Sequence, residues 1–149
     1  MLSVIEKVMF LQDVDIFADV PTEELAYVAA IAEEVTFQEG EDIFQENDPP
    51  DALYLVLEGQ VRLHRGGAEI TTAGPREAFG TWALLDDAPR VVTATARSES
   101  RLLRIDREDF LDILADHIQI TQSIFKTVVK RLRSLMDRLG ADTRAVSTE

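Results

Sequence analysis

Apolar residues recur at helical spacing over the first thirty positions of the chain. Val4, Val8 and Leu11 lie three or four residues apart, which places them on one face of a helix. A second helix is expected to begin at Pro21, because proline suits a first turn and the acids after it favour the positive helix end. The apolar face of this helix comprises Leu25, Val28, Ala29 and Ala32.

Short apolar runs broken by turn residues follow, from residue 34 to about residue 106. The run at 52–57 is apolar throughout, as in a buried strand, whereas several others alternate with polar residues. Glycine pairs and a proline-rich loop separate the runs. Strands this short and frequent predict an antiparallel barrel or sandwich. The predicted strands are 35–37, 42–45, 52–57, 60–64, 68–72, 91–96 and 100–105.

The last third of the chain returns to a helical pattern. Asp106 is expected to cap a helix over 107–115, and Asp109 three residues later resembles a capping box. A long helix is then expected over 118–139 and is predicted to end at Gly140. The remaining residues are expected to form a frayed tail.

The composition excludes several classes of function. A length of 149 residues is typical of one domain with a substantial core. The chain has no cysteine, so disulfides, thiol catalysis and thiolate metal sites are excluded, and a cytoplasmic location is expected. The two histidines, His64 and His117, lie far apart, so we predict no metal site, no catalytic residues and no enzymatic activity. The longest apolar run has eight residues, far short of the roughly 20 needed to cross a bilayer.

Acidic residues outnumber basic ones by 28 to 15, which gives a formal net charge of −13. A surface of this sign repels phosphate, so neither a nucleic-acid partner nor direct membrane insertion is expected. The charge is uneven, because residues 1–60 carry fifteen acids and one base, whereas residues 117–149 carry six bases and three acids. We interpret the acidic half as a solvated surface.

One segment, residues 79–95, interrupts the strands with a different pattern. Gly80 lets the backbone turn sharply, and the residues after it can form one helical turn whose first N–H groups lack helical partners. Arg90 follows Pro89 and could clamp a phosphate through its planar guanidinium. On these residues alone, a solvated arginine and an anion site both remain open.

The same segment resembles the phosphate-binding cassette of the cyclic nucleotide-binding domain family. That family is the module of the catabolite activator proteins, of protein kinase A regulatory subunits and of cyclic nucleotide-gated channels. The flanking segments 40–44, 51–62 and 102–110 resemble the family too, so the resemblance covers roughly residues 15–140. The cassette positions that match are Phe79, Gly80, Ala83, Leu84, Leu85, Pro89, Arg90 and Thr93.

The resemblance implies an α+β fold that forms a single domain over residues 1–149. Its centre is an antiparallel β-roll of about eight strands, of the double-stranded β-helix or jelly-roll type, flanked by N- and C-terminal helices. The implied division is N-terminal helices at 1–33, the roll at 34–105 with the cassette at 79–93, C-terminal helices at 106–140 and a tail at 141–149.

The resemblance also implies a ligand site, with departures from the family pattern. In binding members, the cassette glutamate accepts a hydrogen bond from the ribose 2′-hydroxyl, and the arginine pairs with the cyclic phosphate. Here Thr81 stands at the glutamate position, Trp82 replaces an aliphatic residue and Val91 replaces a small one. We interpret Trp82 as packing into the roll, with a place at the pocket mouth as the alternative. The implied ligand-binding residues are Gly80, Thr81, Trp82, Ala83, Arg90 and Val91.

Two functions from different classes are therefore predicted. The first is a non-catalytic regulatory module that binds cAMP, cGMP or a similar phosphate-bearing molecule, without any other cofactor, and signals through its last helix. The retained Arg90 favours this function. The alternative is a degenerate domain that has lost the nucleotide and serves protein interaction or dimerisation, and Thr81 in place of glutamate favours it.

The last predicted helix carries an apolar seam with spacings of three and four. Packing on its own domain and formation of a coiled-coil homodimer both account for this seam. The matching helix of the catabolite activator proteins is their dimer interface, and we predict a homodimer here. The predicted interface residues are Phe125, Val128, Leu132 and Leu135.

The opening of the chain suggests a further partner. Residues 5–17 resemble the leader of such domains where they are appended to membrane transporters or helical-repeat proteins. An effector protein, or a fused transporter or helical-repeat domain, is therefore expected. No helix-turn-helix segment follows the last helix in this sequence, so we do not expect a transcription factor.

Overall fold

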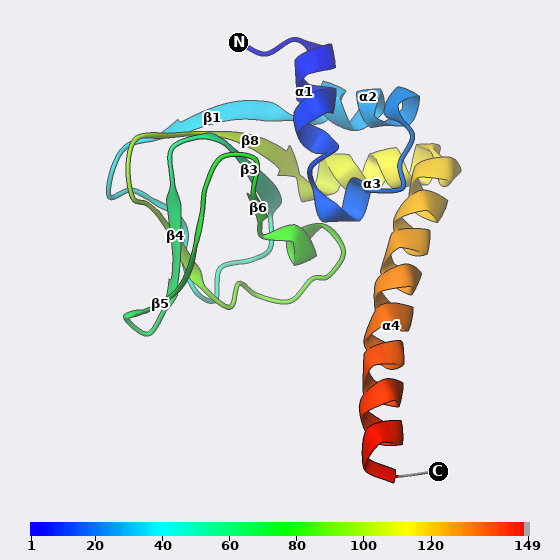
Figure 1. The fold of residues 1–149 in the computed structure, drawn as a ribbon. Coiled ribbons are helices and arrows are strands. Elements are labelled where there is room, and N and C mark those ends of the chain that lie inside the picture. Colours follow the sequence, from blue (N-terminus) through cyan, green and yellow to red (C-terminus); the bar gives the residue numbers. More distant parts are fainter. Residues whose placement is uncertain (148–149) are drawn as a thin grey trace.

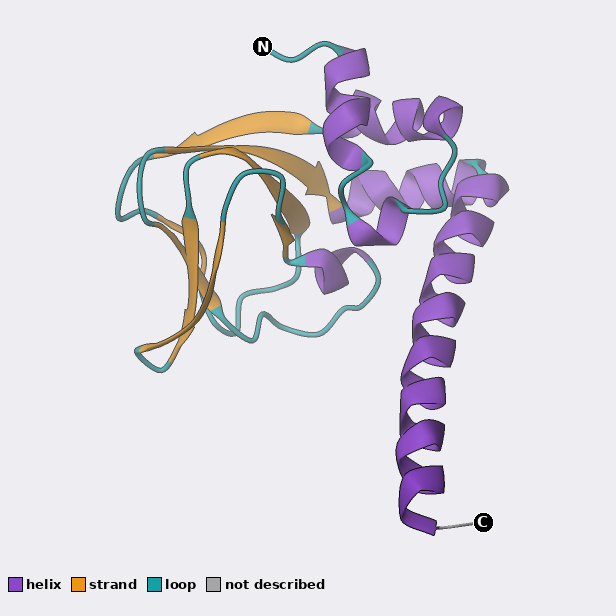
Figure 2. Ribbon diagram, viewed as in Figure 1, coloured by secondary structure: helices purple, strands orange, loops and turns teal. Residues whose placement is uncertain are grey.

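The computed structural model describes residues 1–147, with side chains up to Gly140. In this part of the chain the strands form a β-roll, most helices gather at one end of it, and the last helix extends away as a rod (Figures 1 and 2). The strands are β1 (Glu33–Phe37), β2 (Asp42–Phe44), β3 (Ala52–Glu58), β4 (Val61–Arg65), β5 (Ala68–Ala73), β6 (Ala78–Phe79), β7 (Thr93–Ala96) and β8 (Ser100–Asp106). The helices are α1 (Val4–Leu11), η1 (Asp15–Phe17), α2 (Thr22–Ile31), η2 (Thr81–Leu84), α3 (Arg107–Asp116) and α4 (Ile118–Ser147).

The strands form two sheets in which all neighbouring pairs are antiparallel. One sheet has the order β1-β8-β3-β6, and the other has the order β2-β7-β4-β5. The register of β3 against β8 runs from Ala52 opposite Asp106 to Glu58 opposite Arg101. These sheets confirm the predicted α+β fold with an antiparallel β-roll of about eight strands.

Strand β3 lies between the inside of the roll and helices α1, α2 and α3. The roll and these three helices together form the body of the molecule. Residues 52–57 of β3 are all buried, because successive side chains point to opposite faces of the sheet and both faces are covered. Leu53 and Leu55 pack against the helices in one apolar cluster. Tyr54 and Val56 point into the roll and belong to a second cluster. The uninterrupted apolar pattern of this segment thus reflects burial on two sides.

Local capping contacts account for where the helices begin. Ser3 and Glu6 form a capping box at α1, with each side chain accepting a hydrogen bond from the other residue's backbone N–H at 3.1 Å. Pro21 lies one position before α2 rather than in its first turn. Asp106 caps α3 as predicted, because its carboxylate accepts a hydrogen bond from Asp109 N at 3.0 Å.

Two differences from the predicted strands lie on either side of η2. Strand β6 was missed, because two residues cannot show an alternating pattern. Strand β7 begins at Thr93 rather than at position 91, because Val91 and Val92 belong to the loop that follows η2.

Helix α4 continues to Ser147 and passes through Gly140, so the predicted end at Gly140 is wrong. A glycine inside a helix costs only about 1 kcal/mol relative to alanine, so a single glycine does not by itself end a helix. The predicted tail is therefore helical as far as Ser147, and its last two residues lie outside the described part of the chain.

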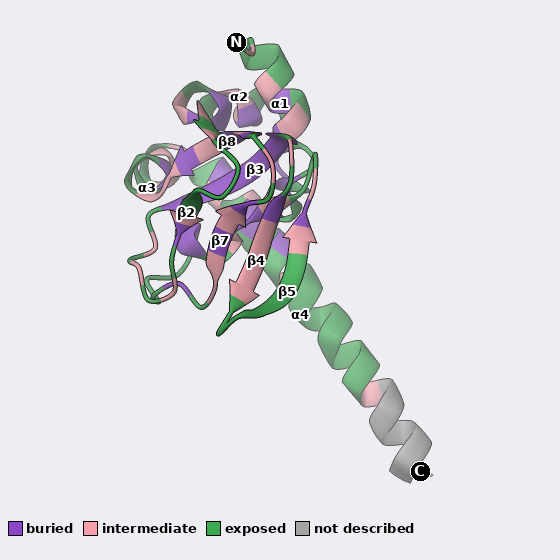
Figure 3. Ribbon diagram, turned by 90° about the vertical axis from the view of Figure 1, so that its left-hand side faces the viewer, coloured by how far each residue is buried: buried purple, intermediate pink, exposed green. Residues whose placement is uncertain are grey.

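Helix α4 packs on the body through its first turns and leaves the predicted seam open. Ile120 and Ile124 are buried in the cluster beneath the helices. The seam residues Phe125, Val128, Leu132 and Leu135 are all exposed, and Figure 3 shows the exposed stretch of α4 beyond the roll. Packing of the seam on its own domain is therefore the wrong interpretation. The homodimer stays a prediction.

None of the helices within the described residues combines the length and the apolar character that crossing a bilayer requires.

Candidate functional site

The cassette begins where β6 ends, at a left-handed turn. Gly80 has φ 74° and ψ 21°, a backbone conformation that favours glycine. A Cβ atom at this position would lie 2.6 Å from Arg90 Nη1 and 3.3 Å from Ala52 O. The turn therefore has room for glycine alone. The single turn of helix that was predicted after it is the 3₁₀ helix η2.

Arg90 reaches the same turn from the other side of the cassette loop, and only 7% of its surface is exposed. Its Nη2 atom donates to Ala52 O at 2.6 Å and to Asp51 Oδ1 at 3.0 Å. The guanidinium carbon lies 4.0 Å from the centroid of the Phe44 ring, which is a cation–π contact. A buried charge needs such partners, because burial without them would be strongly unfavourable.

One donor of this guanidinium is free. Arg90 Nε is buried and has no hydrogen-bond partner in the part of the chain that the structure describes. An unpaired buried donor costs about 1–3 kcal/mol, so an anionic acceptor beside it would be stabilised. The backbone holds the residue in place, since Arg90 N donates to Asp48 O at 2.9 Å and Asn47 N donates to Arg90 O at 2.8 Å.

A cavity of about 340 Å³ opens between η2, the cassette loop and strand β4. Its walls are largely apolar, with Arg90 as a cation and Asp86 as a carboxylate. A volume of this size falls within the range of small-molecule sites. The lining residues are Phe44, Pro50, Leu63, Gly80, Trp82, Ala83, Asp86, Ala88, Pro89, Arg90, Val91 and Val92.

Five of the six predicted ligand-binding residues line this cavity, namely Gly80, Trp82, Ala83, Arg90 and Val91. Thr81 instead lines a separate hollow of about 220 Å³, together with acidic residues of the segment around η1. The structure thus gathers the residues predicted for the phosphate and places the residue predicted for the ribose elsewhere.

Trp82 lies between the cassette cavity and α4. Its side chain is 63% exposed and lines both the cavity and a second hollow that α4 bounds. The interpretation that Trp82 packs into the roll is therefore wrong. The inside of the roll is already filled by three aromatic rings with centroids 5.5–6.1 Å apart, which belong to Phe44, Tyr54 and Phe79.

The sequence did not reveal the partners of Arg90. Asp51 lies 39 positions before Arg90, and no local spacing signals a contact over that separation. The Asp51 carboxylate also lies 3.5 Å from Arg104 Nη2, so it is shared between two guanidinium groups. Behind them, burial raises the pKa of the Tyr54 phenol, whose oxygen accepts a hydrogen bond from Arg104 Nε at 3.4 Å.

The two histidines take part in structural contacts. His64 Nε2 lies 2.8 Å from Thr95 Oγ1, and that hydroxyl donates to Asp42 at 2.6 Å, which lowers the pKa of the Asp42 carboxyl. His117 links α3 to α4 and stacks on Tyr27 at a centroid distance of 3.9 Å. Within the described residues, no three metal-ligating side chains come together.

Comparison with known proteins places the chain in a family. Residues 34–117, more than half of the chain, match the family model of the cyclic nucleotide-binding domain. The chain belongs to this family. The resemblance predicted from the cassette and its flanking segments is thus confirmed, and the residues around the cavity lie inside the matched range.

Individual relatives agree with this assignment. The cyclic AMP receptor protein of Thermus thermophilus is 34% identical over 123 residues, which is 79% of this chain and 57% of that protein. The N-terminal domain of a transcriptional regulator from Streptomyces coelicolor has a similar structure, with a TM-score of 0.80, 34% identity and coverage of 86% of this chain and 95% of that domain. A lysophospholipase nte1 of Neurospora crassa is 30% identical over 130 residues, which is 82% of this chain but 9% of that protein. The chain spans little more than half the length of the curated bacterial regulators that it matches.

Proposed function

We propose that the chain is a non-catalytic regulatory module that binds a 3′,5′-cyclic nucleotide, cAMP or cGMP, in the cassette cavity and signals through α4. The observation that carries this proposal is Arg90, a buried cation with an unpaired N–H beside a cavity of about 340 Å³. A cyclic nucleotide offers one anionic phosphate and a flat base with apolar faces. These features complement one guanidinium in an otherwise largely apolar wall.

The phosphate lies against Arg90 and the start of η2 in this proposal. Within η2 the first backbone hydrogen bond runs from Ala83 N to Gly80 O at 3.0 Å. The N–H groups of Thr81 and Trp82 precede that bond and are available to an acceptor. Asp51 then acts as a positioning residue, because it holds the guanidinium and is not among the residues that line the cavity.

The ribose is held less firmly than in relatives that carry a cassette glutamate. Thr81 lines the neighbouring hollow, and its hydroxyl supplies no carboxylate acceptor. A hydrogen bond to a charged group contributes about 1.5–3 kcal/mol. Its loss corresponds to a roughly ten- to 150-fold lower affinity, so we expect weak binding.

The output of the module is α4, and its partner is a second copy of the chain. Phe125, Val128, Leu132 and Leu135 present an exposed apolar seam with coiled-coil spacing. Pairing two such helices hides the seam from water. The chain belongs to a regulatory family, which supports α4 as the output element. An effector protein or a fused domain receives the signal in this proposal.

Isothermal titration calorimetry with cAMP and cGMP tests the proposal, with adenosine as a control that lacks the phosphate. We expect a saturable heat for at least one cyclic nucleotide and none for adenosine. Absence of heat with both cyclic nucleotides would contradict the proposal and leave protein interaction as the function of the domain.

A further inference from the structure

Helix α4 is attached to the body in two different ways along its length. Its first turns are anchored by apolar packing of Ile120 and Ile124. Farther along, the side chains that form hydrogen bonds or ion pairs with the body are Thr127, Lys130 and Arg131. Among the described residues of α4, no apolar side chain after Ile124 is buried, so polar contacts position the middle of the helix.

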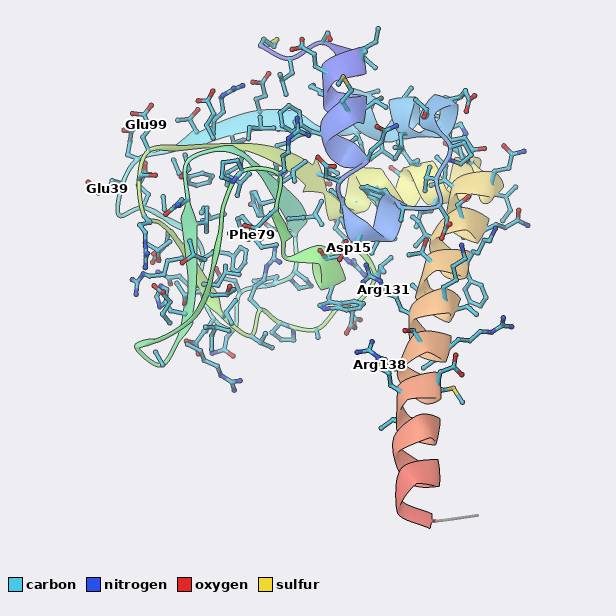
Figure 4. All side chains as sticks on the ribbon, viewed as in Figure 1. Asp15, Glu39, Phe79, Glu99, Arg131 and Arg138 are labelled. Atoms are coloured by element: carbon cyan, nitrogen blue, oxygen red, sulfur yellow. The ribbon has the colours of Figure 1, made fainter. Side chains whose placement is uncertain are left out.

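Two aspartates next to and within η1 receive these three side chains. Asp19 accepts from Thr127 Oγ1 at 2.6 Å on one oxygen and from Lys130 Nζ at 2.9 Å on the other. Asp15 pairs with Arg131 at 3.0 Å, and Figure 4 shows the two side chains facing each other between η1 and α4. Thr127 is only 5% exposed, and its hydroxyl lies closer to this carboxylate than to Ser123 O of its own helix, at 3.2 Å.

Between α4 and the cassette, two hollows leave apolar side chains without close packing partners. A hollow of about 370 Å³ has Trp82 on one side and Leu132 and Leu135 of α4 on the other. A second hollow of about 200 Å³ lies between Leu85 and Phe125. These α4 side chains belong to the seam, so closure on the cassette competes with pairing to a second copy. Where the seam is not paired, burial of these side chains against the cassette would be favourable, and the hydrophobic effect then favours closure of α4. The contacts with η1 oppose that movement.

We propose that Asp15 and Asp19 form a polar latch that sets the angle of α4 to the β-roll. With the latch formed, α4 stands clear of the cassette; with the latch broken, α4 turns about its anchored first turns and closes on Trp82. Asp15 and Asp19 are positioning residues in this account. Polar contacts suit such a switch, because water replaces a partly exposed ion pair at far lower cost than it replaces apolar packing.

The latch rests on the proposed function only in that α4 is the output element, and it can be tested without a ligand. The chain has no cysteine, so Glu99→Cys on the roll and Arg138→Cys on α4 create two unique spin-label positions (Figure 4). Labelled chains are mixed with excess unlabelled chains, so that electron–electron double resonance reports distances within one chain. Asp19→Asn and Thr127→Val are each expected to shift the distribution toward shorter distances, and Asp15→Asn added to Asp19→Asn extends the shift.

Asp13→Asn is the matched control. It removes one carboxylate from the same segment, but Asp13 pairs with Arg76 of the roll at 2.7 Å rather than with α4. We expect this variant to keep the parent distribution. An unchanged distribution in Asp19→Asn and Thr127→Val, or an equal shift in Asp13→Asn, overturns the latch. Neither outcome depends on calorimetric binding of a cyclic nucleotide, so the two proposals fail separately.

Discussion

Gly80 and Arg90 occupy adjoining space in the cassette, and each restricts the other. The positive φ of Gly80 turns the chain into η2, and the missing Cβ leaves room for the Arg90 guanidinium. The guanidinium in turn is held by Asp51 and by the Phe44 ring. The shape of the cavity therefore depends on a residue that has no side chain.

Gly80→Ala is expected to lower the free energy of unfolding by about 1–3 kcal/mol, because alanine is strained at this φ and its Cβ meets Arg90. Urea unfolding followed by circular dichroism measures the effect. Gly40→Ala is the control, since Gly40 has φ 87° but open space around a Cβ. Equal losses in both variants would show that the contact with Arg90 contributes nothing.

At the scale of single residues, the sequence predicted some roles and missed others for a physical reason. Arg90 and Gly80 stand in a local pattern, and both line the cavity as that pattern implies. The contacts of Arg90 with Asp51 and Phe44 depend on how β2 and β3 are placed in space, which no local spacing encodes. Thr81 was expected at the ligand, but the turn of η2 directs it toward another hollow.

Among the elements, α4 has two sides with different chemistry. The side that faces the body is apolar at Ile120 and Ile124 and becomes polar farther along, where Arg131 pairs with Asp15. The other side is the apolar seam, where Leu132 is 56% exposed. A helix with one unpaired apolar side is suited to association with a second copy.

Leu132→Asp is expected to convert a homodimer into a monomer, because a carboxylate would be buried in the apolar seam. Light scattering coupled to size-exclusion chromatography at about 100 μM measures the mass. Ile70→Asp serves as control, since Ile70 is similarly exposed but lies on β5. The unmodified dimer should persist at high salt, because its contact is apolar. A monomeric unmodified protein would disprove the interface.

Long elements with a clear period were predictable, and short ones were not. The helices at both ends and strand β3 follow from apolar spacing, whereas β6 has only two residues. Gly140 misled the prediction of α4, because a glycine marks a helix end only when the chain after it leaves the helix. That choice depends on the residues on both sides of the glycine.

Across the whole molecule, several carboxylates of the acidic surface are tied into the fold. The pKa of Glu6 is lowered by hydrogen bonds from Ser3, and the pKa of Asp19 by hydrogen bonds from Thr127 and Lys130. The pKa of Glu34 is lowered by the backbone N–H of Leu2. A lowered folded-state pKa contributes stability above the unfolded value, and this stability is lost as pH falls through the folded pKa.

Thermal stability is therefore expected to decrease as the pH falls below the ordinary values of 4.5 for glutamate and 3.8 for aspartate. Circular dichroism melts at pH 7, 5 and 3 measure this dependence. Between pH 7 and 5, protonation lowers the net negative charge and relieves repulsion. We therefore expect the decrease in Tm between pH 5 and pH 3. A Tm that keeps rising to pH 3 would contradict the role of these carboxylates.

The β-roll as a whole was predictable, because its turns, alternating strands and cassette pattern all indicate the same fold. The angle of α4 and the hollows beside it were not predictable. They depend on contacts between segments more than a hundred residues apart, such as that of Asp19 with Lys130. The fold follows from sequence patterns that recur along the chain. The placement of α4, which suits the molecule for signalling, follows instead from a few contacts between residues that are distant in sequence.

The affinity of Arg90→Gln for cAMP and cGMP, measured by isothermal titration calorimetry, tests the central claim most directly. Loss of a charged hydrogen bond predicts roughly ten- to 150-fold weaker binding of the cyclic nucleotide that the parent protein binds. Arg65→Gln removes the same charge from the exposed β4–β5 hairpin and should change the affinity by less than about twofold. An Arg90→Gln variant that keeps its fold and binds as tightly as the parent protein would contradict the account.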